Sequence, residues 1–170
     1  MAEPANAARV RHMTSEDVDA VAALIHASWL RTYGPLMGEA RAEAESARKH
    51  APGTIASDLR RAHSESFVAE TEGGGIVGHA HAKVIKGVLW LDRLHLAPGE
   101  HGRGLASALL HAVIANYVGE PSISLEVVKG NDRAIRFYER EGFIVTEERD
   151  DCGGIAGVRT LVMRRAIARA

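Results

Sequence analysis

The segment LHLAPGEHGRGLASALL, residues 94–110, carries the strongest structural signal in the chain. An apolar run leads into a loop with Pro98 and closely spaced glycines, and an amphipathic run begins at Leu105. Glycines let a backbone approach a ligand without interference from a Cβ atom. The first N–H groups of a helix have no partner within it, and the helix dipole attracts anions to them. The pattern predicts a strand, an anion-binding loop and a helix, with a pyrophosphate as the natural occupant.

Hydrophobic periodicity on both sides of this segment predicts a mixed α/β (α+β) sheet, with hairpins in its first half and crossovers in its second. Gly34-Pro35 is expected to break the first helix, and a polar loop containing Cys152 is expected before the last strand. Helices are predicted over 14–31, 39–49, 54–62, 105–118 and 131–141, and strands over 10–12, 66–70, 76–85, 88–96, 123–128, 143–147 and 157–163. We expect a single domain over residues 1–170, with residues 1–8 as a frayed tail.

Composition narrows the functional classes. The 170 residues carry a net charge of −1, so no large basic field is available and nucleic-acid binding is not expected. No apolar run is long enough to cross a bilayer, so no membrane partner is expected either. Cys152 is the one cysteine, which rules out an intramolecular disulfide and favours a cytoplasmic protein.

A second segment, SLEVVKGNDRAIRFYEREGF, occupies residues 124–143. An apolar strand is followed by Asn131, a typical helix N-cap, and Gly142 follows the predicted helix as a C-cap. With HGRGLA at 101–106, this segment resembles the GNAT superfamily of acetyltransferases. That superfamily has Arg/Gln-x-x-Gly-x-Gly/Ala in the first motif, and in the second an Asn, Ala-x-x-Phe-Tyr and Gly-Phe. The first motif departs at His101, where Arg or Gln is usual.

The resemblance implies a mostly antiparallel sheet of six to seven strands, flanked by about four helices. It also implies an N-acetyltransferase, an acyltransferase of EC 2.3.1 type, that moves the acetyl group of acetyl-CoA directly to a primary amine of a small molecule or peptide, without a metal. Tyr138 is implied as the general acid that protonates the leaving thiolate. The implied coenzyme-binding residues are Leu94, His95, Leu96, His101, Gly102, Arg103, Gly104, Leu105, Ala106, Ser107, Asn131, Ala134, Phe137 and Tyr138.

The base that the reaction needs has several candidates. An alkyl ammonium with a pKa of about 10.4 must lose its proton first, at a cost of about 4.6 kcal/mol at pH 7. Asp92 and His95 are expected on opposite faces of a regular strand. A two-residue turn at Lys86-Gly87 places His81 opposite Asp92, either as a base with its orienting acid or as a cross-strand polar pair. Glu126 on the next strand is a further candidate.

Other residues allow structural and functional interpretations. Trp29 and Tyr33 are expected either to form an aromatic wall for the acceptor or to belong to the core. In the superfamily that the chain resembles, the first helices and the last hairpin tend to form the acceptor site, which implies residues 28–34 and the loop over 147–157 here. His79 and His81 share a strand face, but a metal would need further converging ligands, so two surface histidines are expected. A covalent mechanism at Cys152 is chemically open, although a lone cysteine in a polar loop is more often incidental.

Two other functions remain alternatives. The domain could bind acetyl-CoA as a regulatory or sensor module with little turnover, which the substituted His101 favours. The glycine loop could instead hold a dinucleotide, although GRGLAS at 102–107 lacks the third glycine of a Rossmann fingerprint. A homodimer is compatible with the sequence.

Overall fold

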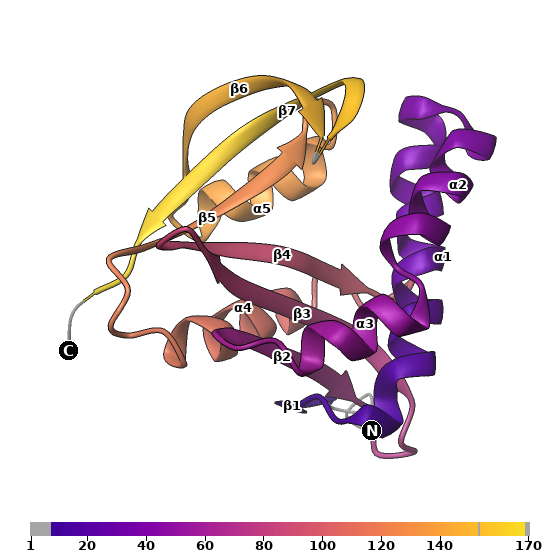
Figure 1. The fold of residues 1–170 in the computed structure, drawn as a ribbon. Helices are drawn as coiled ribbons and strands as arrows, with labels where there is room; N and C mark the ends of the chain where they lie inside the picture. Colours follow the sequence, from indigo (N-terminus) through magenta and orange to yellow (C-terminus); the bar gives the residue numbers. More distant parts are fainter. Residues whose placement is uncertain (1–7, 153, 169–170) are drawn as a thin grey trace, which may run out of the picture.

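The computed structural model describes residues 8–152 and 154–168, so the tail predicted for residues 1–8 lies almost wholly outside the described residues. Its seven strands form one sheet in the order β1-β2-β3-β4-β5-β7-β6 (Figure 1). The strands are β1 (Arg9–His12), β2 (Ser64–Glu70), β3 (Ile76–Ile85), β4 (Val88–Leu96), β5 (Ser122–Val128), β6 (Ile144–Cys152) and β7 (Ile155–Ala166). Every pair is antiparallel except β4 with β5. The sequence-based fold class is confirmed.

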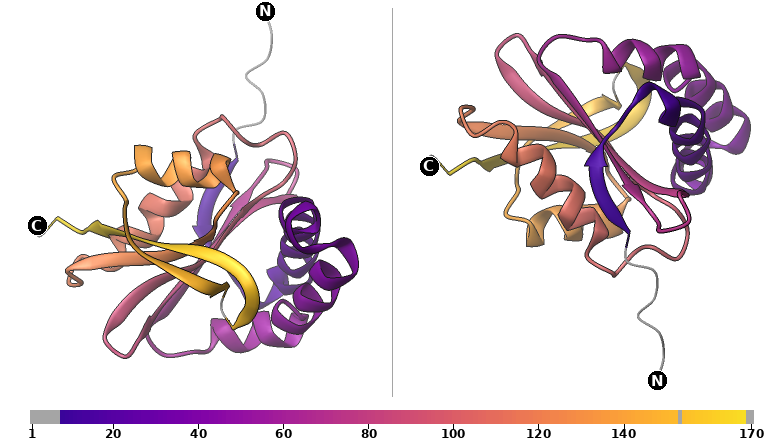
Figure 2. Two further views of the ribbon diagram at one scale, coloured as in Figure 1. Left: turned by 90° about the horizontal axis from the view of Figure 1, so that it is seen from above. Right: turned by 90° about the horizontal axis from the view of Figure 1, so that it is seen from below.

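Five α-helices occur in the described residues, one more than the resemblance implied. They are α1 (Val18–Met37), α2 (Glu39–Lys49), α3 (Pro52–Leu59), α4 (Leu105–Ala115) and α5 (Asp132–Arg140), with a single 3-10 turn at Ser15–Asp17. Helices α1, α2 and α3 lie on one side of the sheet, and α4 and α5 lie on the other (Figure 2). None of the helices described is long and apolar enough to cross a membrane.

The main core lies between the sheet and α4. Leu109, Leu110 and Val113 are fully buried against the inner residues of β2 to β5. The backbone of β3 approaches this helix so closely that a Cβ atom on Gly78 would lie 2.9 Å from Leu109. This packing fixes where α4 begins, and therefore where its unpaired N–H groups point.

The sheet opens between its two parallel strands. The register of β4 with β5 consists of Leu89 opposite Ile123 and Trp90 opposite Ser124. Beyond these residues the two strands separate, and the rest of β4 keeps only its partner β3 on the other side. A strand edge without a partner presents N–H and C=O groups that can bind a ligand.

A β-bulge in β4 changes the faces that its side chains reach. His81 pairs with Arg93 and Ala82 pairs with Leu91, so Asp92 is the extra residue. The prediction that His81 lies directly opposite Asp92 is therefore wrong by one residue, because the bulge interrupts the regular register.

The predicted ends of the first helix and of strand β6 differ most from the structure. Helix α1 continues through Gly34 and Pro35 to Met37, because Pro35 lies in the last turn and removes only one helical hydrogen bond. Strand β6 extends to Cys152 instead of ending at 147. The charged residues after 147 led to the prediction of a loop there. Charged side chains are nevertheless common on an edge strand such as β6.

Candidate active site

A cleft of about 420 Å³ opens where β4 and β5 separate. Its walls come from α1, the end of α2, β4, the loop before α4, β5 and α5, segments that are distant in the sequence. The lining residues are Ser28, Trp29, Arg31, Thr32, Tyr33, His50, Leu91, Asp92, Arg93, Leu94, His95, Leu96, His101, Gly102, Ala106, Leu125, Glu126, Val127, Asn131, Arg133, Ala134, Phe137, Tyr138 and Arg140.

One end of this cleft is formed by backbone, at the start of α4. Gly102 and Gly104 have φ values of +76° and +78°, a conformation that favours glycine. Gly104 is the N-cap of α4, and no side chain caps the helix there. A Cβ atom added to either glycine would meet nothing within 4 Å, so the space beside this loop is open. We call this part of the cleft the coenzyme end.

The residues predicted to hold a coenzyme occupy different positions in this loop. His101, Gly102 and Ala106 line the cleft. Leu105 is buried in the core, and Ser107 donates a hydrogen bond to Glu141. The guanidinium of Arg103 lies 3.4 Å from the Glu100 carboxylate, outside the lining.

Arginines line the coenzyme end. Arg31, Arg133 and Arg140 all border the cleft, and none of them was singled out from the sequence. Arg31 donates to the carbonyl of Leu96 at 3.3 Å, at the unpaired end of β4. Burial, with the charges of Arg133 and Arg31, lowers the pKa of His101 below its ordinary value. These groups can bind the phosphates of a nucleotide coenzyme, since guanidinium groups form strong paired hydrogen bonds with phosphate.

The predicted motif residues of α5 share the cleft wall. The Asn131 side chain accepts a hydrogen bond from the N–H of Ala134 at 3.4 Å, so it serves as the N-cap. Tyr138 borders the cleft, and its ring lies 5.1 Å from that of Phe137. Burial raises the pKa of Tyr138, so its hydroxyl stays protonated at neutral pH and can donate a proton.

Aromatic side chains line the opposite end, which we call the acceptor end. The rings of Trp29 and Tyr33 lie 4.0 Å apart, and His50 packs edge-on against Trp29 at 4.9 Å. All three line the cleft, and the first two also belong to a small core cluster with Ala42. Trp29 and Tyr33 therefore both border the cleft and belong to the core, so each of the two predicted positions describes part of their environment. His50 was missed in the sequence because it lies just after a polar helix with no motif around it.

Three of the four candidate bases border the cleft: Asp92, His95 and Glu126. His95 Nδ1 lies 3.0 Å from Ser28 Oγ, and burial with the charges of His50 and Arg93 lowers the pKa of His95 to about 3. Glu126 accepts a hydrogen bond from Arg149 at 2.7 Å. His81 is fully buried behind this wall, where its Nδ1 lies 2.8 Å from Ser66 Oγ.

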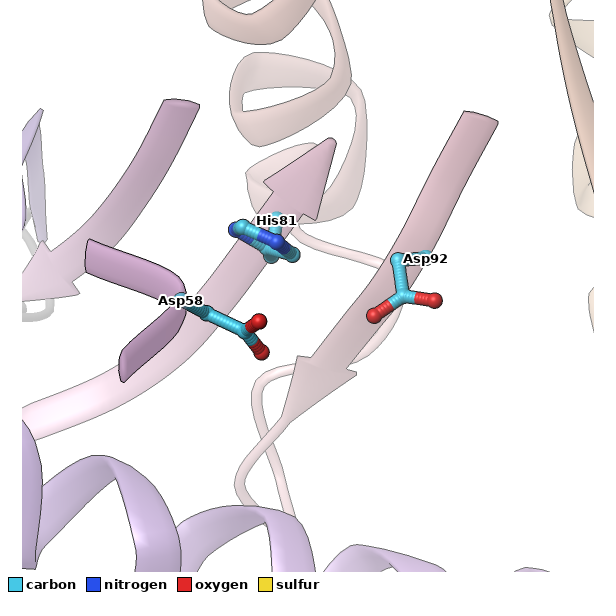
Figure 3. A group of neighbouring side chains, drawn as sticks. All are labelled: Asp58, His81 and Asp92. Atoms are coloured by element: carbon cyan, nitrogen blue, oxygen red, sulfur yellow. The ribbon is translucent and has the colours of Figure 1, made fainter. Parts of the chain in front are cut away.

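The bulge brings polar groups together that a regular strand would separate. Ligand atoms of Asp58, His81 and Asp92 all lie within 4.8 Å of one another (Figure 3). Arg93 pairs with Asp58 at 2.6 Å, and Lys83 pairs with Asp92 at 3.3 Å. These two cations neutralise the carboxylates, so ion pairing accounts for the cluster without a metal.

Several predictions about these side chains are wrong. The side chain of Asp92 reaches His81 on the face that also carries His95, because both residues of a bulge can point the same way. His79 and His81 are fully buried, not surface histidines. Although burial raises the pKa of Asp92, the charges of Arg93 and Lys83 outweigh it and hold that pKa below its ordinary value.

Cys152 lies at the end of β6, beside the Trp29 cluster, and not in a loop. Its thiol is half-buried, and burial raises its pKa. A thiol that ionises less readily is a poorer nucleophile. Cys152 is also absent from the cleft lining, so its position gives no support to a covalent mechanism.

Comparisons with known proteins agree with this geometry. Residues 23–143 match the model of the acetyltransferase (GNAT) family, and the chain belongs to that family. The fold resembles the PaiA N-acetyltransferase of Thermoplasma acidophilum, solved in complex with coenzyme A (TM-score 0.80, 21% identity, 94% of this chain and 98% of that one). It also resembles the ribosomal-protein-S18-alanine N-acetyltransferase of Escherichia coli (TM-score 0.70, 20% identity, 96% of each chain).

Two sequence relatives match parts of the chain. An uncharacterized N-acetyltransferase of Mycobacterium tuberculosis is 38% identical over 98 residues, which cover 55% of this chain and 59% of the relative. A mycothiol acetyltransferase of Propionibacterium freudenreichii is 30% identical over 145 residues, 81% of this chain and 43% of that protein. The chain thus matches little more than half the length of the mycobacterial relative.

Proposed function

We propose that this protein is an N-acetyltransferase that moves the acetyl group of acetyl-CoA directly to a primary amine of a small molecule or peptide. The observation that carries the proposal is the cleft at the separation of β4 and β5, which joins the uncapped start of α4 to the aromatic acceptor end. One sequence relative is named a mycothiol acetyltransferase, and one structural neighbour is named for an alanine of ribosomal protein S18. The proposal therefore covers both small molecules and peptides as acceptors.

The coenzyme end fits acetyl-CoA. The uncapped N–H groups of α4 and the open space beside Gly102 suit a pyrophosphate, and Arg133 and Arg140 supply positive charge. When bound, acetyl-CoA supplies the activated acetyl group. The unpaired edge of β4 between Leu91 and Leu96 offers backbone N–H groups to the acetyl carbonyl, as an oxyanion site requires.

The chain's own residues then manage the protons. Tyr138 is the group we assign to protonate the departing thiolate, because its hydroxyl is kept protonated by burial. Asp92, His95 and Glu126 border the acceptor end and are the candidates that deprotonate the amine or orient it. His81 lies behind them and can act only through Asp92.

The proposal is tested by titrating acetyl-CoA into the protein in a calorimeter and then screening amines for release of free CoA. We expect micromolar binding, and release with at least one amine. Binding without release for any amine would favour the sensor alternative. Absence of binding would overturn the proposal. The dinucleotide alternative has lost its structural basis, because a Rossmann site needs a parallel sheet and β4 with β5 is the one parallel pair in the described residues.

A further inference from the structure

We propose that the proton removed from the amine leaves the cleft through His50, Ser46 and His26, with His50 as a further catalytic residue and the other two as positioning residues. The inference rests on the proposed function, because it concerns the proton that amine acetylation must release. It adds a route that none of the candidate bases named above provides.

His50 has the position of a base. It follows the last residue of α2, is buried, and lines the acceptor end of the cleft. Its ring lies 4.9 Å from that of Trp29 and 6.3 Å from that of His95. An amine that enters along Trp29 towards the end of β4 therefore passes the His50 ring.

A hydrogen-bonded chain leads from this ring towards the surface. Ser46 Oγ lies 3.3 Å from His50 Nδ1 and 2.9 Å from His26 Nδ1. Ser46 is almost completely buried between α1 and α2, whereas His26 on α1 is partly exposed. The serine hydroxyl thus connects a ring in the cleft to a ring that reaches solvent.

The donors and acceptors of this chain can be assigned consistently. A hydroxyl donates one hydrogen bond and can accept others, and a neutral imidazole has one donor and one acceptor nitrogen. If His50 Nδ1 donates to Ser46 Oγ, the serine hydroxyl is free to donate to His26 Nδ1. His50 Nε2 then carries the lone pair, on a ring that lines the cleft.

The proton balance follows from this assignment. Before its nitrogen attacks the acetyl carbon, the bound ammonium loses one proton to His50 Nε2. The second proton, which the nitrogen loses after the attack, balances the proton that Tyr138 gives to the departing thiolate. The Nδ1 proton passes to Ser46 Oγ, the hydroxyl proton passes to His26 Nδ1, and His26 releases its Nε2 proton to water. One proton enters the chain and one leaves it. Water-mediated tautomerisation of the His50 and His26 rings, with rotation of the Ser46 hydroxyl, then restores the starting state without a net gain or loss of protons.

Electrostatics keeps the His50 ring in its neutral form. Burial, together with the charges of Arg93 and Lys49, lowers the pKa of His50 to about 4, and the opposing effect of Asp92 is smaller. His26 on α1 and His95 on β4 also face it. His50 is therefore neutral at pH 7, and a proton that it accepts is passed on readily because the ring holds it weakly.

A structural role alone explains less of this arrangement. A buried hydroxyl must be hydrogen-bonded, but one partner would satisfy it. Helix α2 otherwise buries only Ala42 on this side, so a second alanine at 46 would suit the packing. Ser46 instead has one histidine on the cleft side and one towards solvent.

The first test needs no turnover. Long-range proton–nitrogen NMR of the histidine rings at pH 7 should show His50 in its Nδ1–H tautomer, with the signal assigned by its loss in His50→Gln. Ser46→Ala should shift the ring signals of both His50 and His26. His12→Gln, a change on the exposed edge strand β1, should shift neither. A His50 ring protonated at Nε2 and insensitive to Ser46→Ala would overturn the proposal.

The second test uses the best amine from the screen. At pH 7, His50→Gln should lower kcat about 100-fold, as loss of a general base does, with KM for acetyl-CoA within about twofold. Ser46→Ala should lower kcat about tenfold, the effect of one hydrogen bond. Both deficits should shrink as the pH approaches the pKa of the amine, because the amine then arrives without its extra proton.

The two levels of the proposal fail differently. A His50→Gln variant with the kcat of the wild type at pH 7 would overturn the proton route and leave the proposed function intact. Wild type that releases no CoA with any amine would overturn the proposed function, and the proton route with it. A deficit that stays constant with pH would make His50 a structural residue and would also overturn the route.

Discussion

The two ends of the cleft differ in the groups that form them: mainly backbone at one end and side chains at the other. The coenzyme end depends mainly on backbone, from two glycines in the left-handed region and the uncapped first turn of α4. Arginines from α1 and α5 lie beside this backbone. The acceptor end depends on side chains that α1, α2 and β4 bring together from distant parts of the chain. Backbone sites accept one kind of ligand in many sequences, whereas side-chain sites can differ between family members. The contrast explains why the coenzyme is easier to assign than the amine.

The largest expected effect tests the coenzyme end. Ala106→Glu places a carboxylate in the first turn of α4, facing the cleft. An acidic residue suits the start of a helix, so folding should be preserved, but it occupies the anion site. We expect acetyl-CoA binding to weaken by about 1000-fold, since like charges placed together cost several kcal/mol. Calorimetry measures this directly.

Ala106→Gln is the matched control for that change. It adds similar bulk without the charge, so its acetyl-CoA affinity should fall much less. Equal losses in the two variants would show that Ala106 contacts the coenzyme through shape alone and would remove the electrostatic argument for the start of α4.

The next effect lies at the junction of the two ends. Tyr138→Phe removes the hydroxyl and keeps the ring that packs against Phe137 and Phe143. We expect kcat to fall about 100-fold, as for loss of a general acid, with unchanged acetyl-CoA affinity. Because burial raises the pKa of Tyr138, the wild type should lose no activity from this group up to about pH 9. A Tyr138→Phe variant with full kcat would assign the tyrosine to packing.

A smaller effect concerns the support of the acceptor end. Asp58 on α3 pairs at 2.6 Å with the buried guanidinium of Arg93 on β4. Asp58→Asn should lower the free energy of unfolding by about 2 kcal/mol, less than a fully broken buried pair because Asp92 remains 3.6 Å from Arg93. Urea unfolding gives the value. Glu148→Gln, which breaks more exposed pairs with Lys129 and Arg159, should lower that free energy much less. Equal costs would contradict the structural role of the buried pair.

Sequence reasoning succeeded where the signal is local. The glycine loop, the N-cap at Asn131 and most strands were predicted because each depends on neighbouring residues. These features also carry the family resemblance, so the fold class and the coenzyme followed from the same segments.

Sequence reasoning failed where the geometry of the site depends on contacts between segments that are distant in the chain. The bulge at Asp92 has no sequence mark, yet it decides that Asp92 and His95 share a face. His50 enters the cleft only because α2 packs beside α1. The second half of β6, beyond residue 147, was predicted as a loop because its pairing with β7, rather than its own residues, makes it a strand.

The smallest expected effect distinguishes two arginines at the coenzyme end. Arg133 borders the cleft and lowers the pKa of His101 beside it, whereas Arg103 is paired with Glu100 away from the lining. Arg133→Ala should weaken acetyl-CoA binding about tenfold, the value of one charge-assisted hydrogen bond, and Arg103→Ala less than about twofold. Calorimetry at fixed salt measures both. The opposite order would mean that Arg103 leaves Glu100 when the coenzyme binds, and that the loop before α4 contributes side chains as well as backbone to this end of the cleft.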